Sequence, residues 1–239
     1  MGETSLPGTS ILRLGDLALR RPSVVAVIVG DVEDAVNEAA RQGADMLEVR
    51  LDLIPEEPLE ALRRVRKLSR LPIIATNRIR REGGGFQDSE EERAELLIRA
   101  SAHADLVDVE LRSTILSLVR ESVKKPLIIS YHHFQSAPGR EELSGIIREM
   151  QDRGADIAKI AATPPALEDC LAMLETLIAA RIPTCMLGMG EVGRHLRIMA
   201  PCYGSVLTYG YITGQTAPGQ MRVDELVEAL RILALRQPF

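Results

Sequence analysis

Residues 43–52 read Gly-Ala-Asp-Met-Leu-Glu-Val-Arg-Leu-Asp, and residues 154–161 read Gly-Ala-Asp-Ile-Ala-Lys-Ile-Ala. In both stretches a glycine ends an amphipathic segment, because glycine readily adopts the left-handed conformation that terminates helices. A run rich in aliphatic residues follows at once, as expected for a β-strand. A helix that leads directly into a strand, twice in one chain, indicates repeated β-α units.

The same alternation extends along the chain. Short apolar runs predict roughly eight strands, at 24–29, 46–51, 73–77, 106–111, 127–131, 157–161, 184–187 and 205–209. Apolar residues at three- and four-residue spacing predict helices between them, at 31–42, 58–68, 89–102, 112–119, 140–153, 165–180, 192–199 and 222–235. Such units close most readily into an α/β fold of the (β/α)8 TIM barrel type. A doubly wound open sheet is the alternative, but Val29-Gly30-Asp31-Val32 does not supply the GxGxxG that would support it.

The domain organisation is expected to be simple. No linker, low-complexity run or change in composition divides the 239 residues, of which 46% are apolar. We therefore predict a single barrel domain over 1–239. Residues 1–22 precede the first predicted strand and form an N-terminal extension, either an added hairpin or an irregular segment.

Composition argues against several classes of partner. The net charge is -5, and with 4 Tyr, 3 Phe and no Trp there are few rings on which bases could stack, so a nucleic-acid partner is not expected. The 3 cysteines form no CxxC pair, which fits a reducing compartment. The opening segment has no apolar run of signal-peptide length, and no window reaches the roughly 20 apolar residues of a membrane span. We expect a cytoplasmic protein that does not bind membranes.

Three polar side chains share one face of the predicted strand at 46–51. Glu48, Arg50 and Asp52 alternate with apolar residues, so they point to the same side. On an edge strand this pattern would indicate a salt-bridged surface. A closed barrel has no edge, and its reactive side chains gather at the carboxyl ends of the strands, so we favour a functional site.

Lys159 is the only charged residue in the apolar run at 157–162. Lysine is rarely buried without a partner or a task, but its stem can also lie along apolar surface while the ammonium group reaches water. The lysine alone supports both explanations about equally. A free lysine has a pKa near ~10.4, and an apolar interior with neighbouring arginines would lower that pKa through desolvation and like charge. Lys159 is therefore a candidate amine nucleophile.

Two adjacent histidines, His132 and His133, end the predicted strand at 127–131. An imidazole at the end of a strand near Lys159 can transfer protons at physiological pH. Adjacent strand residues point to opposite faces, so we expect one inward histidine and one ordinary loop histidine. For the same reason a metal site built from both histidines and nearby acids is only weakly supported.

Arginines and a glycine-rich segment suggest an anionic ligand. A guanidinium group can bind a carboxylate through two parallel hydrogen bonds. Arg78 follows the predicted strand at 73–77, and Arg197 lies beyond the glycine-rich stretch at 188–193, although either arginine alone is more often a surface charge. The glycine-rich stretch at 188–193 could instead bind a phosphate, which would point to a phosphosugar substrate. The polar segment at 210–220 is either a lid or simply a long loop.

Taken in order, the motifs resemble the type I 3-dehydroquinate dehydratases of the shikimate pathway, which leads to chorismate and the aromatic amino acids. The resemblance extends from about residue 24 to about residue 235. The matching motifs are ExRxD at 48–52, RxxxEGG at 78–84, DxE at 108–110, SYH at 130–132, KIA at 159–161, MGxxGxxxR at 189–197 and APGQ at 217–220. Each motif is short, but the ordered set is specific.

The resemblance implies a (β/α)8 barrel and a hydro-lyase that converts 3-dehydroquinate to 3-dehydroshikimate and water, without a cofactor or a metal. By the same resemblance Lys159 forms an imine with the substrate ketone. His132 acts as general base and then general acid, and Glu48 orients it and tunes its pKa. The resemblance assigns substrate-binding positions to Arg50, Arg78, Arg197, Thr216 and Gln220. It places Glu82 and Met189 near the lid and the lysine, with less specific roles in substrate binding. It also makes a homodimer plausible.

Three positions depart from the usual family pattern. Gly188 replaces a common serine, His133 replaces an aspartate, and Thr216 replaces a serine but keeps its hydroxyl. His133 leaves open which imidazole faces inward, and spacing from Ser130 favours His132. Two other functions remain open: another imine-forming barrel such as an aldolase, and a non-catalytic barrel that binds a small carboxylic acid.

Overall fold

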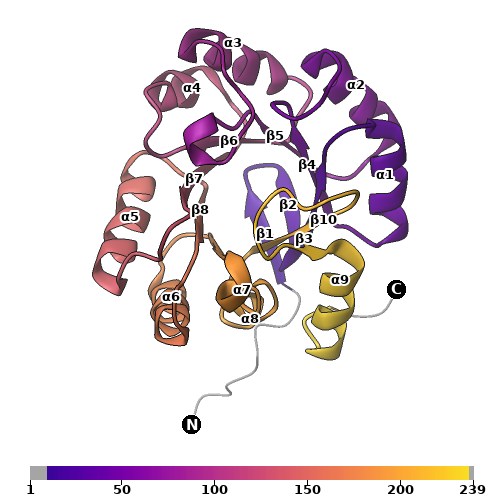
Figure 1. Cartoon of the computed structure of the whole chain (residues 1–239). Coiled ribbons are helices and arrows are strands. Elements are labelled where there is room, and N and C mark those ends of the chain that lie inside the picture. The colour runs from indigo at the N-terminus through magenta and orange to yellow at the C-terminus, as the bar shows by residue number, and fades with distance from the viewer. Residues whose placement is uncertain (1–9, 237–239) are drawn as a thin grey trace.

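The protein is a closed ring of parallel strands surrounded by helices. The computed structural model describes residues 10–236, and Figure 1 shows it along the axis of the ring. The ring strands are β3 (Ser23–Ile28), β4 (Met46–Arg50), β5 (Ile73–Thr76), β6 (Leu106–Glu110), β7 (Leu127–His133), β8 (Ile157–Ala162), β9 (Thr184–Gly188) and β10 (Leu207–Tyr211). The prediction of an α/β (β/α)8 barrel is confirmed.

The strands follow one another around the ring in chain order. Each hydrogen-bonds in parallel to the next from β3 to β9, β10 pairs with β3, and the short strand β11 (Met221–Arg222) adds to β10. Between β9 and β10 the ring closes through the Val206 amide, which donates to the Thr184 carbonyl at 2.9 Å. The Met186 amide also donates to the Ser205 hydroxyl there, at 3.1 Å.

The helices cover the outside of the ring. They are α1 (Val32–Arg41), α2 (Pro58–Leu68), α3 (Glu90–Ala100), α4 (Leu116–Ser122), α5 (Arg140–Asp152), α6 (Leu167–Ala179), α7 (Gly190–Gly193), α8 (Leu196–Cys202) and α9 (Val223–Ile232). A 3-10 turn, η1 (Arg80–Glu82), follows β5. Among the residues described, no helix has the length and apolar character needed to cross a bilayer.

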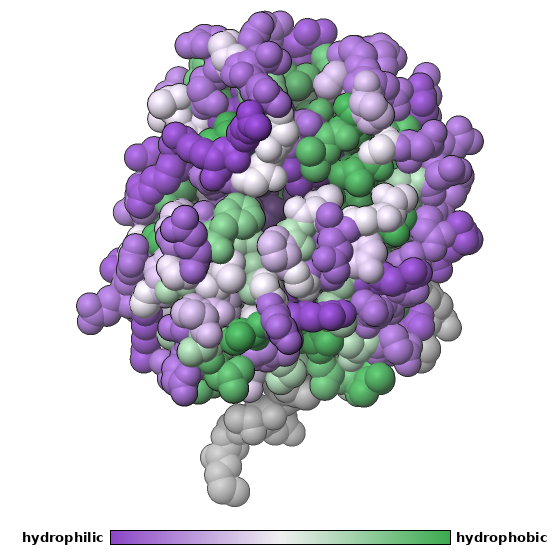
Figure 2. Space-filling model, viewed as in Figure 1, coloured by the Kyte–Doolittle hydropathy of each residue, from purple (hydrophilic) through white to green (hydrophobic). Residues whose placement is uncertain are grey.

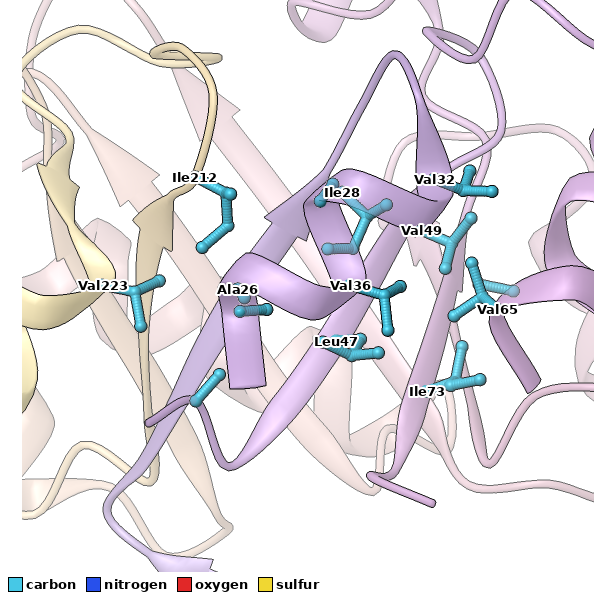
Figure 3. Close-up of a cluster of buried hydrophobic side chains, with 14 of the residues drawn as sticks. Ala26, Ile28, Val32, Val36, Leu47, Val49, Val65, Ile73, Ile212 and Val223 are labelled. Carbon is cyan, nitrogen blue, oxygen red and sulfur yellow. The ribbon is translucent and has the colours of Figure 1, made fainter. Parts of the chain in front are cut away.

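The strand sequences show why the sheet has two different faces. Side chains alternate along a strand, so Leu47 and Val49 point outward, where they are buried against Val32 and Val36 of α1 and Val65 of α2 (Figure 3). Each fully buried aliphatic side chain of this kind stabilises the fold by about 1.5–3 kcal/mol. The intervening Glu48 and Arg50 of β4 therefore point into the ring.

A hairpin closes the amino-terminal end of the ring. Strands β1 (Ser10–Leu14) and β2 (Leu17–Arg21) pair in antiparallel fashion, and in Figure 1 they lie inside the ring of strands. Leu14 and Leu19 are buried in one cluster with residues from the starts of the ring strands, among them Val25 and Ile157. The N-terminal extension is thus a hairpin over 10–21, while residues 1–9 lie outside the described part of the chain.

Two predicted helices and one predicted strand were placed wrongly. The helix expected at 112–119 begins at Leu116, because the Ser113 side chain bonds Glu90 and Arg93 and holds the preceding residues in a turn. The helix expected at 192–199 is divided into α7 and α8, where the His195 ring bonds the Val192 carbonyl. The strand expected at 205–209 lies at 207–211, since Ser205 and Val206 bond to β9 ahead of the regular ladder.

Candidate active site

A cavity opens at the carboxyl-terminal end of the ring, opposite the hairpin. Figure 2 shows a hollow near the centre of this face. All ten side chains predicted from the sequence as site residues line this one cavity: Glu48, Arg50, Arg78, Glu82, His132, Lys159, Met189, Arg197, Thr216 and Gln220. They come from strands and loops distributed around the ring, and the parallel strand direction places them at the same end.

Lys159 lies at the base of the cavity, on the inner face of β8, and is 4% exposed. Its Nζ lies 3.0 Å from Asp108 Oδ2 and 3.3 Å from Glu48 Oε1. The Thr76 hydroxyl donates to the same Glu48 oxygen at 3.0 Å. The amine is thus held by two buried carboxylates on neighbouring parts of the ring.

The expected surroundings of Lys159 were wrong in one respect. An apolar environment with neighbouring arginines was predicted, but the polar atoms nearest Nζ are carboxylate oxygens. Arg78, on the far side of Asp108, donates to Asp108 Oδ1 at 2.6 Å. Asp108 is shared between the two cations, and although burial opposes its ionisation, Arg78 and Lys159 hold its pKa well below the usual range.

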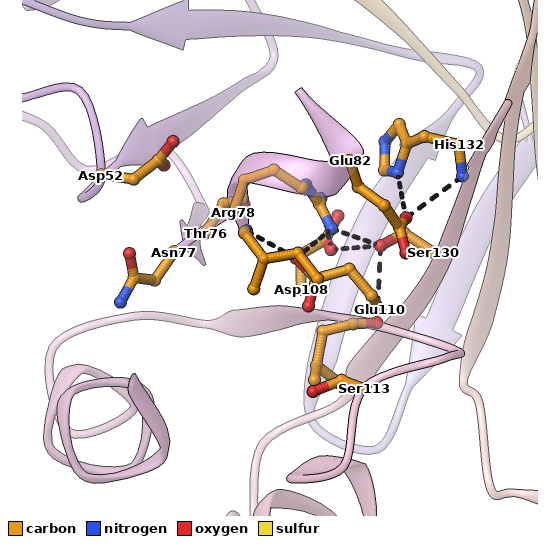
Figure 4. Close-up of polar contacts among 12 residues, drawn as sticks. Asp52, Thr76, Asn77, Arg78, Glu82, Asp108, Glu110, Ser113, Ser130 and His132 are labelled. Carbon is orange, nitrogen blue, oxygen red and sulfur yellow. Dashed lines mark hydrogen bonds and ion pairs between the residues drawn. The ribbon is translucent and has the colours of Figure 1, made fainter. Parts of the chain in front are cut away.

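His132 is paired with Glu82, and this corrects a second expectation. The Glu82 Oε2 atom lies 3.0 Å from His132 Nδ1 and accepts the His132 backbone N–H at 3.3 Å (Figure 4). Glu48, which was expected to orient this histidine, bonds Lys159 and Thr76 instead. The physical reason is position: η1 brings Glu82 over the end of β7, whereas Glu48 lies on β4 in the ring wall.

Burial shifts the pKa values of both members of this pair. It raises the pKa of Glu82 to about 7, partly offset by Arg78. Burial, Arg78 and Lys159 together lower the pKa of His132 well below its usual range. The imidazole is therefore neutral at pH 7. An ionised Glu82 only accepts hydrogen bonds, so it selects the tautomer with a proton on Nδ1 and leaves Nε2 free to take a proton.

His133 does not share the cavity with its neighbour. Its Nδ1 accepts the Ser136 amide at 3.1 Å, in the loop after β7, while His132 lines the cavity. The two imidazoles diverge because consecutive strand residues face opposite sides. Among residues 10–236, no group of three or more His, Cys, Asp or Glu side chains is arranged to hold a metal ion.

A buried ion-pair network supports the side of the cavity that holds Lys159. Arg78 contacts Asp108, the Ser130 hydroxyl at 2.7 Å and Glu110 at 3.0 Å, as Figure 4 shows. Glu110 also accepts from Arg93 at 2.6 Å. Removing one member of such a network would leave an uncompensated buried charge, which typically costs about 3–5 kcal/mol. The network fixes the position of Asp108 beneath Lys159.

Arg197 is a cavity cation without a carboxylate partner among the described residues. It is 2% exposed, and its two terminal nitrogens donate to the carbonyls of Tyr209 at 3.2 Å and Pro218 at 3.4 Å. Its Nε has no partner within the described residues, and none of their carboxylates lies within 4.0 Å. Burial lowers the pKa of Arg197 to about 10, which leaves it charged at neutral pH. A buried, unmatched guanidinium suits a ligand carboxylate.

The segment at 210–220 folds over the cavity next to Arg197. Gln220 Oε1 accepts from the Thr216 amide at 2.8 Å and its hydroxyl at 3.1 Å, which folds the loop back on itself. The Gly190 amide donates to the Pro218 carbonyl at 3.2 Å. The Met189 amide likewise donates to the Ala162 carbonyl, so these two amides of the glycine-rich stretch at 188–193 are occupied by the protein itself and are not free for a phosphate.

The last two predicted residues differ in their surroundings. Arg50 is occupied by Asp52, with two nearly parallel bonds of 2.9 and 2.6 Å. Burial opposes ionisation of Asp52, but Arg50 and the Gly85 amide lower its pKa. Met189 is buried beside the cavity and presents an apolar wall. Arg50 is thus held at the rim with one guanidinium nitrogen uninvolved in the pair.

The sequence reasoning did not assign site roles to Asp108, Ser130 and Tyr209. Asp108 follows the same two-residue alternation as Glu48, so its inward direction was recognisable from the strand pattern. The strand pattern did not indicate that Lys159 and Arg78 are the partners of Asp108. Tyr209 lies at an inward position of β10, with its ring centroid 4.2 Å from Lys159 Nζ.

Sequence comparison identifies the known proteins that this chain resembles. The family model described as Type I 3-dehydroquinase matches residues 23–237. A 3-dehydroquinate dehydratase from Methanothrix thermoacetophila is 45% identical over 225 residues, covering 94% of this chain and 98% of that protein. Another from Methanocella arvoryzae is 40% identical, covering 90% and 98%.

Solved structures agree as well. The crystal structure of 3-dehydroquinate dehydratase from Geobacillus kaustophilus HTA426 has a TM-score of 0.86 and 29% identity, covering 96% of this chain and 98% of its own. The type I enzyme from Clostridium difficile, solved with covalently modified comenic acid, has a TM-score of 0.81 and 28% identity, with coverage of 95% and 98%. Because the family model matches nearly the whole length of the chain, the chain belongs to the type I 3-dehydroquinase family.

Proposed function

We propose that this protein is a hydro-lyase of the shikimate pathway that converts 3-dehydroquinate to 3-dehydroshikimate and water through an imine on Lys159. The observation that carries the proposal is the convergence of three groups in one cavity. These are a buried primary amine, an imidazole–carboxylate pair and a guanidinium group without a carboxylate partner. No cofactor is part of this proposal.

Imine formation uses Lys159 and its carboxylates. The ammonium group passes one proton to a carboxylate, and Asp108 and Glu48 both lie within reach at 3.0 and 3.3 Å. The free amine then attacks the ketone carbon and a C–N bond forms. The ketone oxygen takes one proton from the nitrogen and the proton held by the carboxylate, and leaves as water. The resulting protonated imine withdraws electrons and acidifies the neighbouring C–H bond.

His132 then transfers two protons in sequence. Its neutral imidazole takes the proton from the acidified carbon, and the electrons of that C–H bond move toward the imine nitrogen. They return to expel the hydroxyl group, which receives the proton from His132 and leaves as water. Hydrolysis of the imine consumes one water, releases 3-dehydroshikimate and restores the Lys159 amine. Glu82 keeps the imidazole in the basic tautomer.

The remaining residues hold the substrate in this scheme. Arg197 binds the carboxylate, while Arg50, Arg78, Thr216 and Gln220 contact hydroxyl groups or the carboxylate. Glu48 supports the lysine rather than the histidine. Met189 supplies an apolar contact beside the reacting atoms. The loop at 210–220 excludes water when it lies as observed.

Two measurements on the purified protein test the proposal. Incubation with 3-dehydroquinate and borohydride should add a stable ligand mass on Lys159, and ultraviolet absorbance should report formation of the conjugated product. An aldolase would give the adduct without the enone absorbance. A non-catalytic barrel that binds a carboxylic acid would give neither, and either of these results would refute the proposal.

Replacement of Arg197 by alanine should act mainly on substrate affinity. Removing one member of a buried, hydrogen-bonded charge pair usually costs about 2–5 kcal/mol, so KM should rise at least about 30-fold while kcat changes much less. Arg197→Lys is the matched control, because it keeps the charge but not the paired geometry, and it should lie in between. Unchanged KM in Arg197→Ala would remove this residue from the carboxylate site.

Glu82 should set the acid limb of the pH profile. Its pKa of about 7 means that it is ionised above this pH and protonated below it. Once protonated, it can donate to His132 Nδ1, and the imidazole proton then sits on Nε2, where the base is needed. We expect kcat/KM, which reports groups of the free enzyme, to fall about tenfold per pH unit below this point. Glu82→Gln cannot titrate, so its limb should move to lower pH at a reduced plateau. If the acid limb is unchanged in Glu82→Gln, a group other than Glu82 sets it.

Three further expectations are proposed in the same way; the first two rest on composition and sequence pattern, and the third rests on the family resemblance. The protein acts as a single barrel domain, functions in the cytoplasm and assembles as a homodimer. Sedimentation equilibrium at several concentrations tests the assembly, since a monomer at all of them would contradict it.

A further inference from the structure

The aromatic side chain beneath the reactive amine is not accounted for by the scheme above. Tyr209 extends inward from β10 and is 3% exposed. The Nζ atom of Lys159 lies over its ring, 4.2 Å from the centroid. This distance is within the range of cation–π contacts, which strengthen when both groups are buried.

The hydroxyl group of Tyr209 does not explain why the ring is there. Its oxygen is buried and has no hydrogen-bond partner among the described residues. The ring is instead held by packing, in the interior cluster that includes Val27, Cys185 and Leu187. The contact with Lys159 therefore belongs to the ring, and the hydroxyl is not needed to place it.

The lysine nitrogen is cationic both in the resting ammonium group and in the protonated imine, but its hydrogen bonds differ between the two. An ammonium group has three N–H donors and can satisfy both Asp108 and Glu48. A protonated imine keeps the positive charge but only one N–H, so at least one carboxylate loses its donor. A ring face attracts the cation without requiring any N–H. Its share in stabilising the nitrogen thus increases when the imine forms.

We propose that Tyr209 is a further catalytic residue, whose ring face stabilises the cationic imine nitrogen on Lys159. The proposal rests on the imine route given above. The ring lowers the free energy of the cationic imine relative to the neutral amine that attacks the ketone, and such differential stabilisation favours imine formation. Any side chain at position 209 that presents an aromatic face to the Lys159 nitrogen should stabilise the imine in the same way.

Three replacements of Tyr209 separate the ring from the hydroxyl and from bulk. Tyr209→Phe keeps the ring and removes the unpartnered hydroxyl, so kcat should stay within about threefold of the unmodified protein. Tyr209→Leu keeps an apolar side chain without a ring face. It should lower kcat and the fraction trapped by borohydride as Lys159 adduct by about 30-fold, which corresponds to ~2 kcal/mol for a desolvated contact. Thermal unfolding of each variant identifies any loss of fold.

A graded series provides a measurement that a packing role would not change. Phenylalanine carrying one, two or three ring fluorines can be placed at position 209, and each fluorine weakens the electrostatic attraction of the ring face with little change in volume. The logarithm of the rate of adduct formation should fall steadily with fluorine number. A flat series, or Tyr209→Leu within twofold of Tyr209→Phe, would overturn the inference. Absence of any adduct in the unmodified protein would refute the imine route itself, a separate outcome.

Discussion

Replacement of Lys159 by alanine is expected to abolish both the borohydride-trapped adduct and product formation. Without the amine, no imine can form, and the carbon next to the ketone loses the electron sink that makes its hydrogen acidic. The expected loss in turnover exceeds the factor of about 10²–10⁴ assigned to proton transfer alone. Mass spectrometry of the trapped protein and absorbance of the product measure the two effects.

The other lysines provide the controls. The chain has only three more, Lys67, Lys124 and Lys125, and all are exposed and outside the cavity. Lys125→Ala should keep full activity and full labelling. Lys159→Arg restores a positive charge between Asp108 and Glu48 but cannot act as a nucleophile at neutral pH, so it should fold and remain inactive. An adduct on another lysine in Lys159→Ala would contradict the assignment.

Much of the fold and the membership of the site could be predicted from the sequence, because both depend on local patterns. Alternation in the strand at 46–50 determines that Glu48 and Arg50 face inward, and the isolated Lys159 marks its strand in the same way. Parallel strands then bring their carboxyl ends together whatever lies between them in the chain. These two facts place Glu48, Arg50 and Lys159 in the cavity, whereas the loop residues Glu82, Thr216 and Gln220 were assigned from the family resemblance.

The pairing within the site could not be predicted in the same way. Glu48 was assigned to His132 but contacts Lys159, because partners across a barrel depend on strand register and tilt, which no single strand encodes. Glu82 reaches His132 from the 3-10 turn η1, a segment without the periodicity that marks regular structure. Asp108, and not the expected arginine, lies beside Lys159. This pairing also depends on strand register and tilt.

Replacement of His132 by alanine should separate the two halves of the reaction. Lys159 and its carboxylates remain, so borohydride should still trap the substrate imine at close to the normal extent. Proton abstraction from carbon and protonation of the leaving hydroxyl both lose their agent, and kcat should fall about 10²- to 10⁴-fold. Single-turnover experiments that follow trapped imine and product in parallel measure this separation.

His133→Ala is the matched control, because it removes an identical side chain one residue away. Its ring bonds Ser136 outside the cavity, so turnover should stay within about twofold of the unmodified protein. The opposite result, with His132→Ala active and His133→Ala inactive, would mean that β7 presents its other face to the substrate. Loss of trapping in His132→Ala would instead assign the imidazole a role in imine formation, since the bond to Lys159 would then depend on proton transfer by the same group.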